Sequence, residues 1–318
     1  MSNIELALEN AKDCFPICIP SYNRWDRNEN KTITKIIEKL PEELQKNTYV
    51  FVRKQQKEKY DASFKTVNII VLPDYITGCS LTRQYMYDYI FEQTKQPYCI
   101  DMDDDITDLK YIEYRDGKAS LSLKDETKYG QILTLGSEIA RIAFEKDNCL
   151  LGNFHRVRFA NSDYNATHCY TTNKGSTPRQ MMFVNIKGLR ERDIKRNAMF
   201  DNPEIGTTGE DIGFVAEIAK KRGDMFNINC LAYAYVDDAL NSVTRNDDNR
   251  RILAEYEYEC LKKYPIINYL RIPFTYEDGA YKFSDIDFTK YRKLCNKKSV
   301  SLELSTLCKI KKWSDSNE

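Results

Sequence analysis

The sequence lacks the features that mark membrane and secreted proteins. No apolar run approaches the roughly 20 residues of a membrane-spanning helix, and the residues that follow Met1 contain no apolar signal core. The ten cysteines include no Cys-x-x-Cys pair, so neither a zinc site nor a redox motif is indicated and reduced thiols are favoured. We therefore expect a soluble, cytoplasmic protein without a membrane partner.

An excess of charge of either sign is also absent, because 48 lysines and arginines balance 48 aspartates and glutamates. The whole chain therefore has no strong positive field of the kind that a non-specific nucleic-acid binder needs, and any site for a polyanion must be local. With 42% apolar and 12% aromatic residues, the 318-residue chain can bury a sizeable core as one large or two unequal domains.

The most informative stretch is 97–106, where a short apolar run leads into a block of carboxylates. Its pattern predicts a buried strand with the acids at its carboxyl end. Such closely spaced carboxylates repel one another unless a cation, basic side chains or solvent offset their charge. An Asp-x-Asp at a strand end suits Mg²⁺ or Mn²⁺, so Asp103 and Asp105 are the predicted ligands. A solvated acidic turn is the alternative.

Upstream of this block, apolar strands alternate with helical patterns. Strands are predicted at 14–20, 49–52 and 67–72, and helices at 30–40 and 78–92. This alternation predicts a parallel sheet with right-handed crossovers, which the acidic strand completes. No glycine-rich phosphate loop follows the first strand, which speaks against a nucleotidyltransferase.

Downstream of the block, the alternation is less regular. Asp116-Gly117 between alternating apolar residues predicts a β-hairpin turn. The later predicted elements are the hairpin over 109–123, a helix at 129–144, strands at 149–159 and 180–186 around a loop at 161–178, a helix at 212–222, a strand at 225–236, and charged helix followed by a lysine-rich tail from 246 onward.

Four groups of residues, in this order, make the chain resemble a known family. They are 19–24 after the first strand, Thr82-Arg83 at the start of a helix, 103–105, and 209–211 before a later helix. Over residues 14 to 245 the chain looks like a GT-A fold glycosyltransferase, similar to glycosyltransferase family 2. Within that fold it is most similar to the TET-associated glycosyltransferases that modify hydroxymethylpyrimidine in the DNA of bacterial viruses.

The resemblance implies an α/β fold of the GT-A type, Rossmann-like, with a mostly parallel sheet and flanking helices, in residues 1–245. The nucleotide-sugar half would span about 14–105 and the acceptor half about 106–245. Residues 246–318 would add a helical, basic C-terminal extension. The same resemblance implies an enzyme of the cytoplasm, and of the host cytoplasm if the chain is viral.

For the donor site, the resemblance implies a nucleotide-sugar, UDP-glucose or a similar donor, together with Mn²⁺ or Mg²⁺. A departing nucleoside diphosphate needs its developing charge neutralised, and a divalent cation on the Asp-x-Asp supplies that. Arginine donors match phosphate or uracil oxygens, although a structural ion pair is the alternative for each arginine. The predicted donor residues are Pro20, Tyr22, Arg24, Arg83 and Asp104, whereas Asp101 is expected to be structural.

A third metal ligand is less clearly marked. GT-A enzymes often supply a late histidine, but both histidines of this chain, His155 and His168, precede Glu210. The resemblance therefore implies either no third protein ligand or a late carboxylate or amide. The candidates are Asp237, Asp238 and Asn241.

The resemblance assigns the general base to Asp211, with Glu210 positioning the acceptor or the sugar. A carboxylate there would take the proton of the acceptor hydroxyl as the sugar carbon is attacked, and a base opposite the departing nucleotide implies a single displacement with inversion. Helix capping is the alternative, since acids are favoured in the first turn of a helix.

The predicted acceptor site lies in two stretches where basic and apolar residues interleave, 154–159 and 187–196. Arginines there would follow phosphates of DNA, and Phe154, Phe159 or Tyr170 would stack on an extruded base. Solvated surface is the alternative. The predicted acceptor residues are His155, Arg156, Arg158, Arg190 and Arg192.

Together these features predict an inverting, metal-dependent hexosyl- or pentosyltransferase whose favoured acceptor is 5-hydroxymethylpyrimidine in DNA. One alternative is a glycosyltransferase that acts on a glycan, a lipid carrier or a protein. A more distant one is a non-catalytic nucleotide-binding or nucleic-acid-binding module.

Overall fold

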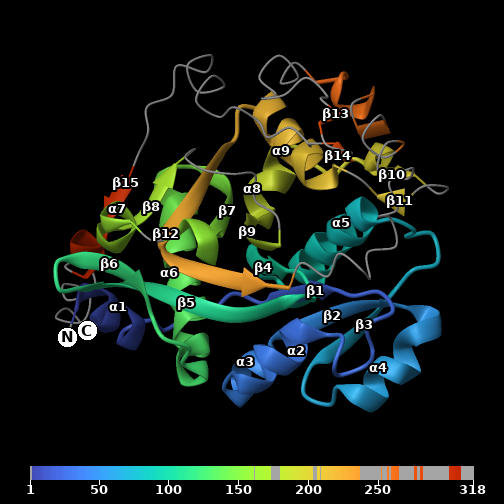
Figure 1. Ribbon diagram of the computed structural model, residues 1–318. Helices are drawn as coiled ribbons and strands as arrows, with labels where there is room; N and C mark the ends of the chain where they lie inside the picture. The colour runs from blue at the N-terminus through green and yellow to red at the C-terminus, as the bar shows by residue number, and fades with distance from the viewer. Residues whose placement is uncertain are drawn as a thin grey trace.

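A computed structural model describes most of the first 236 residues and several shorter segments beyond them. The described residues are 2–160, 162–172, 180–202, 206–207, 209–236, 252, 256–257, 259–264, 276–277, 280–281 and 301–308. Within them, one large mixed sheet forms the centre of the molecule and helices cover both of its faces (Figure 1).

Four parallel strands form the first half of the sheet, in the order β3-β2-β1-β4. They are β1 (Ile17–Pro20), β2 (Thr48–Arg53), β3 (Asn68–Leu72) and β4 (Tyr98–Met102). Their central residues are fully buried, since Ile19, Val50 and Ile100 are 0% exposed. Parallel strands of this kind are covered on both faces, which explains their continuous apolar sequence. The predicted parallel sheet is confirmed, and the acidic block follows its fourth strand.

The second half of the sheet is mixed. Strand β9 (Met181–Asn185) runs antiparallel between β4 and β7 (Cys149–Arg156). Strand β12 (Asp224–Tyr235) lies parallel to β7 and antiparallel to β8 (His168–Thr172). The prediction of a loop over 161–178 is wrong for its described part, which forms α7 (Asp163–Thr167) and β8. Pairing with β12 supplies partners for the backbone of β8, and this tertiary contact has no local sequence signal.

The long strand β12 changes partner along its length. One edge of β12 pairs with β7, with a register shift between Ile228 and Ala232. The other edge pairs first with β8 and then, from Leu231 onward, with β5 (Ile106–Arg115). At its end the Val236 backbone N–H donates to the Asp105 carbonyl oxygen at 3.1 Å. The end of β12 therefore lies directly beside the acidic block. The predicted hairpin is confirmed as β5 and β6 (Lys118–Leu121).

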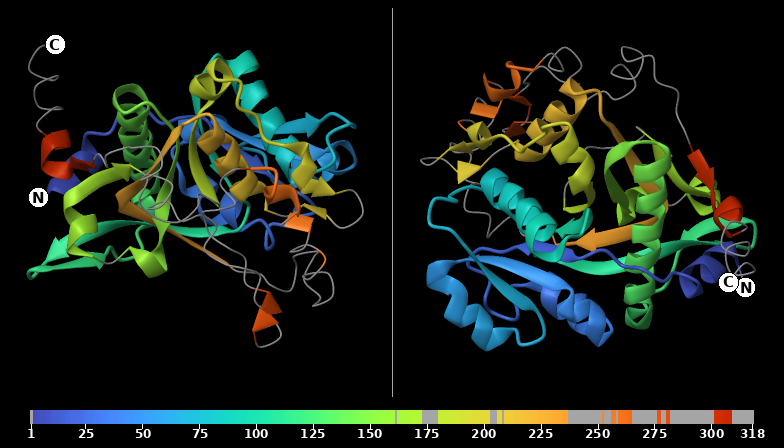
Figure 2. Two further views of the ribbon diagram at one scale, coloured as in Figure 1. Left: turned by 90° about the horizontal axis from the view of Figure 1, so that it is seen from above. Right: turned by 180° about the vertical axis from the view of Figure 1, so that it is seen from behind.

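Two apolar layers pack against the sheet, one on each face. Figure 2 shows the same two layers of helices from above and from behind. One layer includes α1 (Asn3–Glu9), α2 (Lys31–Lys35), α4 (Lys57–Ser63) and α6 (Tyr129–Lys146), with α3 (Glu42–Lys46) next to α2 in the chain, and the opposite layer includes α5 (Cys79–Tyr89), α8 (Ile186–Glu191) and α9 (Glu210–Lys220). Shorter strand pairs are β10 (Asp201–Asn202) with β11 (Gly206–Thr207), and β13 (Tyr276–Glu277) with β14 (Ala280–Tyr281).

Two described segments of the last 73 residues (246–318) join this body. Strand β15 (Ser301–Glu303) pairs with β8, and Leu304 and Leu307 are buried in the layer that contains α1. Cys260 and Tyr264 are buried in the layer that contains α9. A separate C-terminal extension stays a prediction, and of its lysine-rich tail over 288–318 only 301–308 is among the described residues. No helix in the described part of the chain is long and apolar enough to cross a bilayer.

Candidate active site

A cavity of about 1140 Å³ opens at the carboxyl ends of the parallel strands. Open α/β sheets bind ligands at this edge, and the volume is slightly above the range of about 300–1,000 Å³ that is usual for small-molecule and cofactor pockets. The lining comes from the loops after β1, β2 and β3, from the start of α5, from the acidic block, and from the start of α9. It includes Pro20, Tyr22, Arg24, Arg53, Lys54, Asp74, Cys79, Arg83, Asp103, Asp104, Thr207, Glu210 and Asp211.

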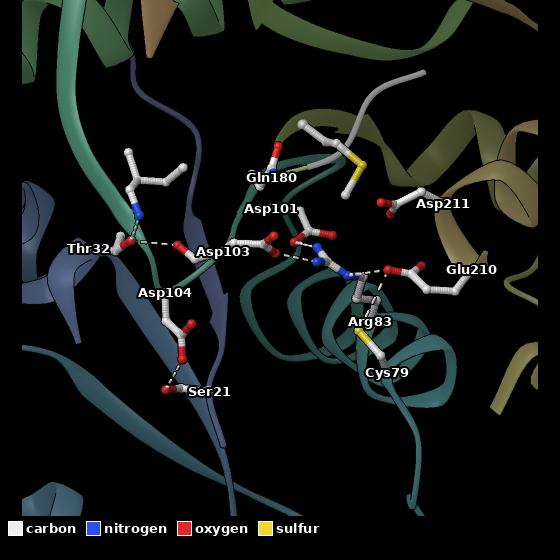
Figure 3. A network of polar contacts seen from close by, with 12 residues as sticks. Ser21, Thr32, Cys79, Arg83, Asp101, Asp103, Asp104, Gln180, Glu210 and Asp211 are labelled. Carbon is white, nitrogen blue, oxygen red and sulfur yellow. Dashed lines mark hydrogen bonds and ion pairs between the residues drawn. The ribbon is translucent and has the colours of Figure 1, made fainter. Parts of the chain in front are cut away.

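The middle acid of the block, Asp104, is tied to the loop after β1. Its Oδ1 accepts from Arg24 Nη1 at 2.6 Å, and its Oδ2 accepts from Ser21 Oγ at 2.7 Å (Figure 3). The Tyr60 hydroxyl lies 2.8 Å from Ser21 Oγ and accepts from the Arg24 backbone N–H at 3.0 Å. These bonds fix the loop on one wall of the cavity. Tyr22 is 59% exposed beside it, with its ring open to a ligand.

Backbone contacts fix the turn that carries the acids. The Thr32 hydroxyl donates to the Asp103 carbonyl oxygen at 2.5 Å and accepts from the Ile106 backbone N–H at 2.8 Å. On the other side, the Asp103 backbone N–H donates to the Gln180 carbonyl oxygen at 2.7 Å. The Asp-x-Asp is therefore held from both neighbouring elements, before any ligand binds.

Arg83 lies between the acid turn and the start of α9 (Figure 3). It is 3% exposed, and its two Nη atoms donate to Asp101 Oδ1 and Asp103 Oδ1. Its Nε lies 3.4 Å from Glu210 Oε1. Because its guanidinium faces three carboxylates, Arg83 takes the ion-paired arrangement that was the alternative to direct nucleotide contact. Asp101, which is 0% exposed, has the structural place expected for it.

A second buried arginine, Arg196, faces the same acids from the opposite side. Its Nη1 contacts Glu210 Oε2, and its Nη2 lies 3.8 Å from Asp101 Oδ2. Sequence reasoning missed Arg196, because the basic stretch around it gives no sign of which side chain turns inward. Arg53 and Lys54 were also missed, although their place directly after the second strand is a usable signal.

The start of α5 is tied to the segment that precedes α9. Asp201 accepts from the backbone N–H groups of Ser80 and Leu81 at 3.0 Å each, and from the Thr207 hydroxyl at 2.7 Å. Only glycine fits at position 78, since a Cβ there would lie 1.9 Å from Asp201 Cγ. This cap fixes α5, and with α5 the position of Arg83.

Glu210 and Asp211 form the first turn of α9, after Gly209 in the left-handed region with φ of 62°. Burial raises the pKa of Glu210 to about 7, and the two arginines oppose that shift. Asp211 Oδ1 is buried and has no hydrogen-bond partner among the described residues. The acids do more than cap the helix, because Glu210 points to the arginines and Asp211 to the cavity.

Asp105 Oδ1 is likewise buried without a hydrogen-bond partner in the described part of the chain. Burial raises the pKa of Asp105 to about 6, with a further contribution from the charge of Asp104. Burial also raises the pKa of Asp103, against the opposing effect of Arg83. Asp105 thus has a carboxylate oxygen without a partner, and it lies near Asp103, whose pKa is also raised. A bound cation would stabilise the ionised form of both side chains.

The balance of charge also favours a bound cation. Five acids meet two guanidinium groups, which leaves an excess of 5 − 2 = 3 negative charges when every acid is ionised. The acids are Asp101, Asp103, Asp105, Glu210 and Asp211. Such an excess in a partly buried site favours a divalent cation. Among the described residues, no three His, Cys, Asp or Glu side chains form a ready-made metal site.

The candidates for a third ligand, Asp237, Asp238 and Asn241, lie outside the described residues. The chain leads into them from Val236, whose backbone N–H bonds the Asp105 carbonyl oxygen. Their role as metal ligands stays a prediction.

Of the predicted acceptor residues, the structure brings Arg156 nearest to the acid turn. Its Nη2 donates to Gln180 Oε1 at 2.9 Å, and its guanidinium lies 5.1 Å from the centre of the Tyr235 ring. Gln180 is the residue whose carbonyl oxygen bonds Asp103. Arg156 thus extends the site toward the end of β12.

The other predicted acceptor residues are more scattered. His155 Nε2 lies 3.1 Å from Asn229 Oδ1, and burial lowers its pKa. Arg190 pairs with Asp88 and Glu92, and Asp88 lies about 14 Å along α5 from the end that faces the cavity. Arg158 is exposed, and Arg192 is half-buried.

The expected stacking by Phe154 or Tyr170 is wrong, because both rings are buried in the core, at 0% and 2% exposure. Each lies on a strand of the second half of the sheet. Phe154 packs against Phe183, and Tyr170 packs against Phe226. The side chain of Phe159 lies outside the described residues.

A sheet that begins with four parallel strands, an Asp-x-Asp at the end of the fourth, and a cavity at their carboxyl ends form an architecture of the GT-A type. Residues 15–147 match the family model described as TET-Associated Glycosyltransferase. No curated protein matches the chain.

Three solved structures follow a similar course. Glucosyl-3-phosphoglycerate synthase from Mycobacterium tuberculosis, in complex with Mg²⁺ and UDP, is 11% identical with a TM-score of 0.43, over 89% of this chain and 90% of that one. GalNAc-T7 with UDP, GalNAc and Mn²⁺ is 11% identical with a TM-score of 0.45, over 90% and 56%. Mannose-1-phosphate geranyltransferase from Thermus thermophilus is 9% identical with a TM-score of 0.39, over 70% and 75%.

The ion pairs of Arg83 predict a large effect on stability. Arg83→Met should lower the free energy of unfolding by about 3 kcal/mol or more, because removing one partner leaves the buried Asp101 charge poorly compensated. Urea denaturation measures this. The matched control is Arg190→Met, which removes an exposed pair with Asp88 and should cost about 0–1 kcal/mol. Equal losses in the two variants would contradict the assignment of Arg83 as the main counter-charge of the buried acids.

Proposed function

We propose that the protein is an inverting, metal-dependent glycosyltransferase that moves a sugar from a nucleotide-sugar to 5-hydroxymethylpyrimidine in DNA. The observation that supports it most is that one cavity is lined both by Asp103 and Asp104 of the acidic block and by Glu210 and Asp211 at the start of α9. The charges of Asp103 and Asp211 are close enough to raise the pKa of Asp103. The residues proposed to bind the donor and the residue proposed to activate the acceptor would therefore face the same cavity.

The donor would be UDP-glucose or a similar nucleotide-sugar. Its nucleoside fits the wall made by Tyr22 and Arg24, where an exposed ring can stack on a base and a guanidinium can approach the diphosphate or base oxygens. Arg53 and Lys54 add positive charge at the same wall. Pro20 leads into this loop, and Asp104 holds the loop through its hydrogen bonds with Arg24 and Ser21. Arg83 would act indirectly, by its contact with Asp103.

The residues present fit a divalent cation. Asp103 and Asp105 would hold Mn²⁺ or Mg²⁺, which neutralises charge on a departing diphosphate when bound. Arg83 occupies Asp103 Oδ1, which leaves Oδ2 of that residue and the orphaned Oδ1 of Asp105 for the cation. Asp237, Asp238 or Asn241 remains the proposed third ligand.

Asp211 would act as the general base. Asp211 lines the cavity and its Oδ1 has no hydrogen-bond partner among the described residues, so this carboxylate can accept the proton of an acceptor hydroxyl as the oxygen attacks the sugar carbon, and attack opposite the departing nucleotide gives inversion. Glu210 is less suited, because the two arginines already contact its two oxygens. It would instead help to position the acceptor or the sugar.

The DNA acceptor is proposed from the family of residues 15–147, whose description links it to TET enzymes and thus to oxidised methylpyrimidines. Arg156 and Arg158 would contact phosphates near the site, together with His155, whereas Arg190 and Arg192 would contact them farther away. A glycan, lipid-carrier or protein acceptor is the competing possibility, and these acceptors form separate arms of the test.

The direct test is intact-mass analysis of short DNA duplexes with and without 5-hydroxymethylcytosine or 5-hydroxymethyluracil. Each duplex is incubated with the protein, Mn²⁺ and one nucleotide-sugar from a panel. We expect the mass of one sugar residue to be added to the hydroxymethylated strand and nothing to be added to the unmodified strand. Sugar transfer to a glycan, lipid or protein acceptor, with none to any duplex, would overturn the DNA assignment while the transferase assignment stands.

Metal binding gives a prediction that does not depend on turnover. In the presence of Mn²⁺, Asp105→Asn should weaken UDP binding roughly tenfold or more, because an amide oxygen carries no charge for the cation. Burial raises the pKa of Asp105 to about 6, so Mn²⁺ affinity should fall as the pH drops through that value and the carboxylate takes up a proton. Calorimetric titration measures both effects.

Asp116→Asn, in the exposed turn of the β5–β6 hairpin, is the control for the same chemical change. It should leave UDP binding unchanged. UDP binding that is equally strong in chelator and in Mn²⁺ would refute the metal site.

The base assignment predicts a specific kinetic pattern. Asp211→Asn should lower the chemical rate by about 10²–10⁴-fold with donor and acceptor affinities nearly intact, because an amide cannot take the acceptor proton. Asp211 lies in the first turn of α9, after the N-cap Gly209, so the change removes a charge–dipole contribution of only about 0.3–1 kcal/mol and the fold should be retained. Glu210→Gln should have a smaller effect on the rate. Single-turnover transfer to the hydroxymethylated duplex measures this, and a rate above one tenth of wild type in Asp211→Asn would exclude Asp211 as the base.

A further inference from the structure

Arg196 is the most deeply buried cation of the site. Its side chain is 1% exposed, and it lies in the segment between α8 and the residues that precede α9. Its backbone N–H donates to Gln84 Oε1 at 3.0 Å, which ties this segment to α5. The guanidinium lies 4.3 Å from the centre of the Phe214 ring. Packing and hydrogen bonding therefore leave it little freedom of orientation.

The guanidinium of Arg196 divides its contacts between two groups. On one side, Nε and Nη2 donate to the Tyr87 hydroxyl at 3.2 and 3.0 Å, and that hydroxyl donates to Asp101 Oδ2 at 2.5 Å. On the other side, Nη1 donates to Glu210 Oε2. A planar group with several donors can make both sets of contacts at once, which the single ammonium of lysine cannot do.

The two arginines together face both carboxylate oxygens of Glu210. Oε2 contacts Arg196, and Oε1 lies 3.4 Å from Arg83 Nε and 3.6 Å from Cys79 Sγ. The neighbouring Asp211 receives much less, since its Oδ1 is 3.9 Å from Arg196 Nη1 and has no hydrogen-bond partner among the described residues. Two acids that are adjacent in sequence thus have different environments, and Arg196 contributes to both.

We propose that Arg196 is a positioning residue for transfer: it holds Glu210 against Arg83 and thereby leaves Asp211 as the acid that takes the acceptor proton. This inference rests on the proposed function. Stability of the core alone does not explain why an arginine is buried at position 196. Burying an ion pair costs desolvation free energy, which an apolar side chain of similar size would avoid. The arrangement instead fixes the carboxylate beside the base.

The consequence is specific. Without Arg196, Glu210 loses its partner at Oε2, and its charge would then repel the carboxylate of Asp211 or share a proton with it, which would disturb the proposed base. Donor binding should change little, because the nucleotide wall around Tyr22 and Arg24 does not contact Arg196. The defect should therefore appear in kcat and not in the KM for the donor.

The experiment compares Arg196→Met and Arg196→Lys with wild type, using UDP-glucose and Mn²⁺ and measuring UDP release with a hydroxymethylated duplex or with water as acceptor. We expect Arg196→Met to lower kcat roughly 10–100-fold with the donor KM within about threefold. Arg196→Lys should retain more of the rate, since it keeps the charge but not both sets of contacts. The control is Arg141→Gln, which removes a more exposed pair with Asp13 at 3.1 Å and should match wild type.

A double variant tests whether Arg196 acts through Glu210. Arg196→Met combined with Glu210→Gln should be no slower than Arg196→Met alone, because the displaced charge is then absent. Losses that multiply would overturn the proposal, as would a raised donor KM with unchanged kcat. If Arg196→Met does not fold, Arg196→Lys decides: a full wild-type kcat overturns the proposal, and a rate several-fold lower with unchanged donor KM supports it.

The two proposals can fail separately. A wild-type protein that releases no UDP from any nucleotide-sugar overturns the proposed function and this inference with it. A wild-type protein that turns over, beside an Arg196→Met variant of equal kcat, overturns the inference alone.

Discussion

The site depends on how one fully buried carboxylate is neutralised. Asp101 lies inside β4 with no exposed surface, and a lone charge there would be strongly unfavourable. Arg83 from α5 and the Tyr87 hydroxyl satisfy it directly, with Arg196 at 3.8 Å. Each arginine then reaches beyond Asp101, Arg83 to the Asp-x-Asp and both of them to Glu210. The acids of the cavity are therefore oriented by groups that also compensate a buried charge in the sheet.

This shared compensation couples two parts of the chain that lie about 100 residues apart. The Asp-x-Asp and the first turn of α9 draw on the same two guanidinium groups, so the ionisation of one set of acids affects the pKa of the other. Asp201 adds a mechanical connection, since it caps α5 and binds Thr207 just before α9. Charge–charge interactions and hydrogen bonds thus connect the same two parts of the chain.

Much of this was predictable from the sequence, and the exceptions share a cause. The four parallel strands, the hairpin and helix α9 follow local apolar patterns, and the Asp-x-Asp could be placed because acids at a strand end must lie at the sheet edge. Strand β8 and Arg196 could not be predicted, because each takes its role from a partner distant in sequence. Phe154 and Tyr170 show the reverse error: aromatic residues near basic ones suggested a binding surface, but the strands that carry them are buried along most of their length.

The pairing of β15 with β8 has a consequence for handling the protein. Strand β8 would otherwise end the sheet, and an uncovered edge offers its N–H and C=O groups to any other extended chain. Ser301–Glu303 covers that edge, while Leu304 and Leu307 close the apolar layer beside α1. A chain shortened before Ser301 would keep every residue of the cavity described above and would still be prone to self-association along β8. Poor solubility of such a shortened form would thus reflect a lost edge cover and would not indicate a damaged active site.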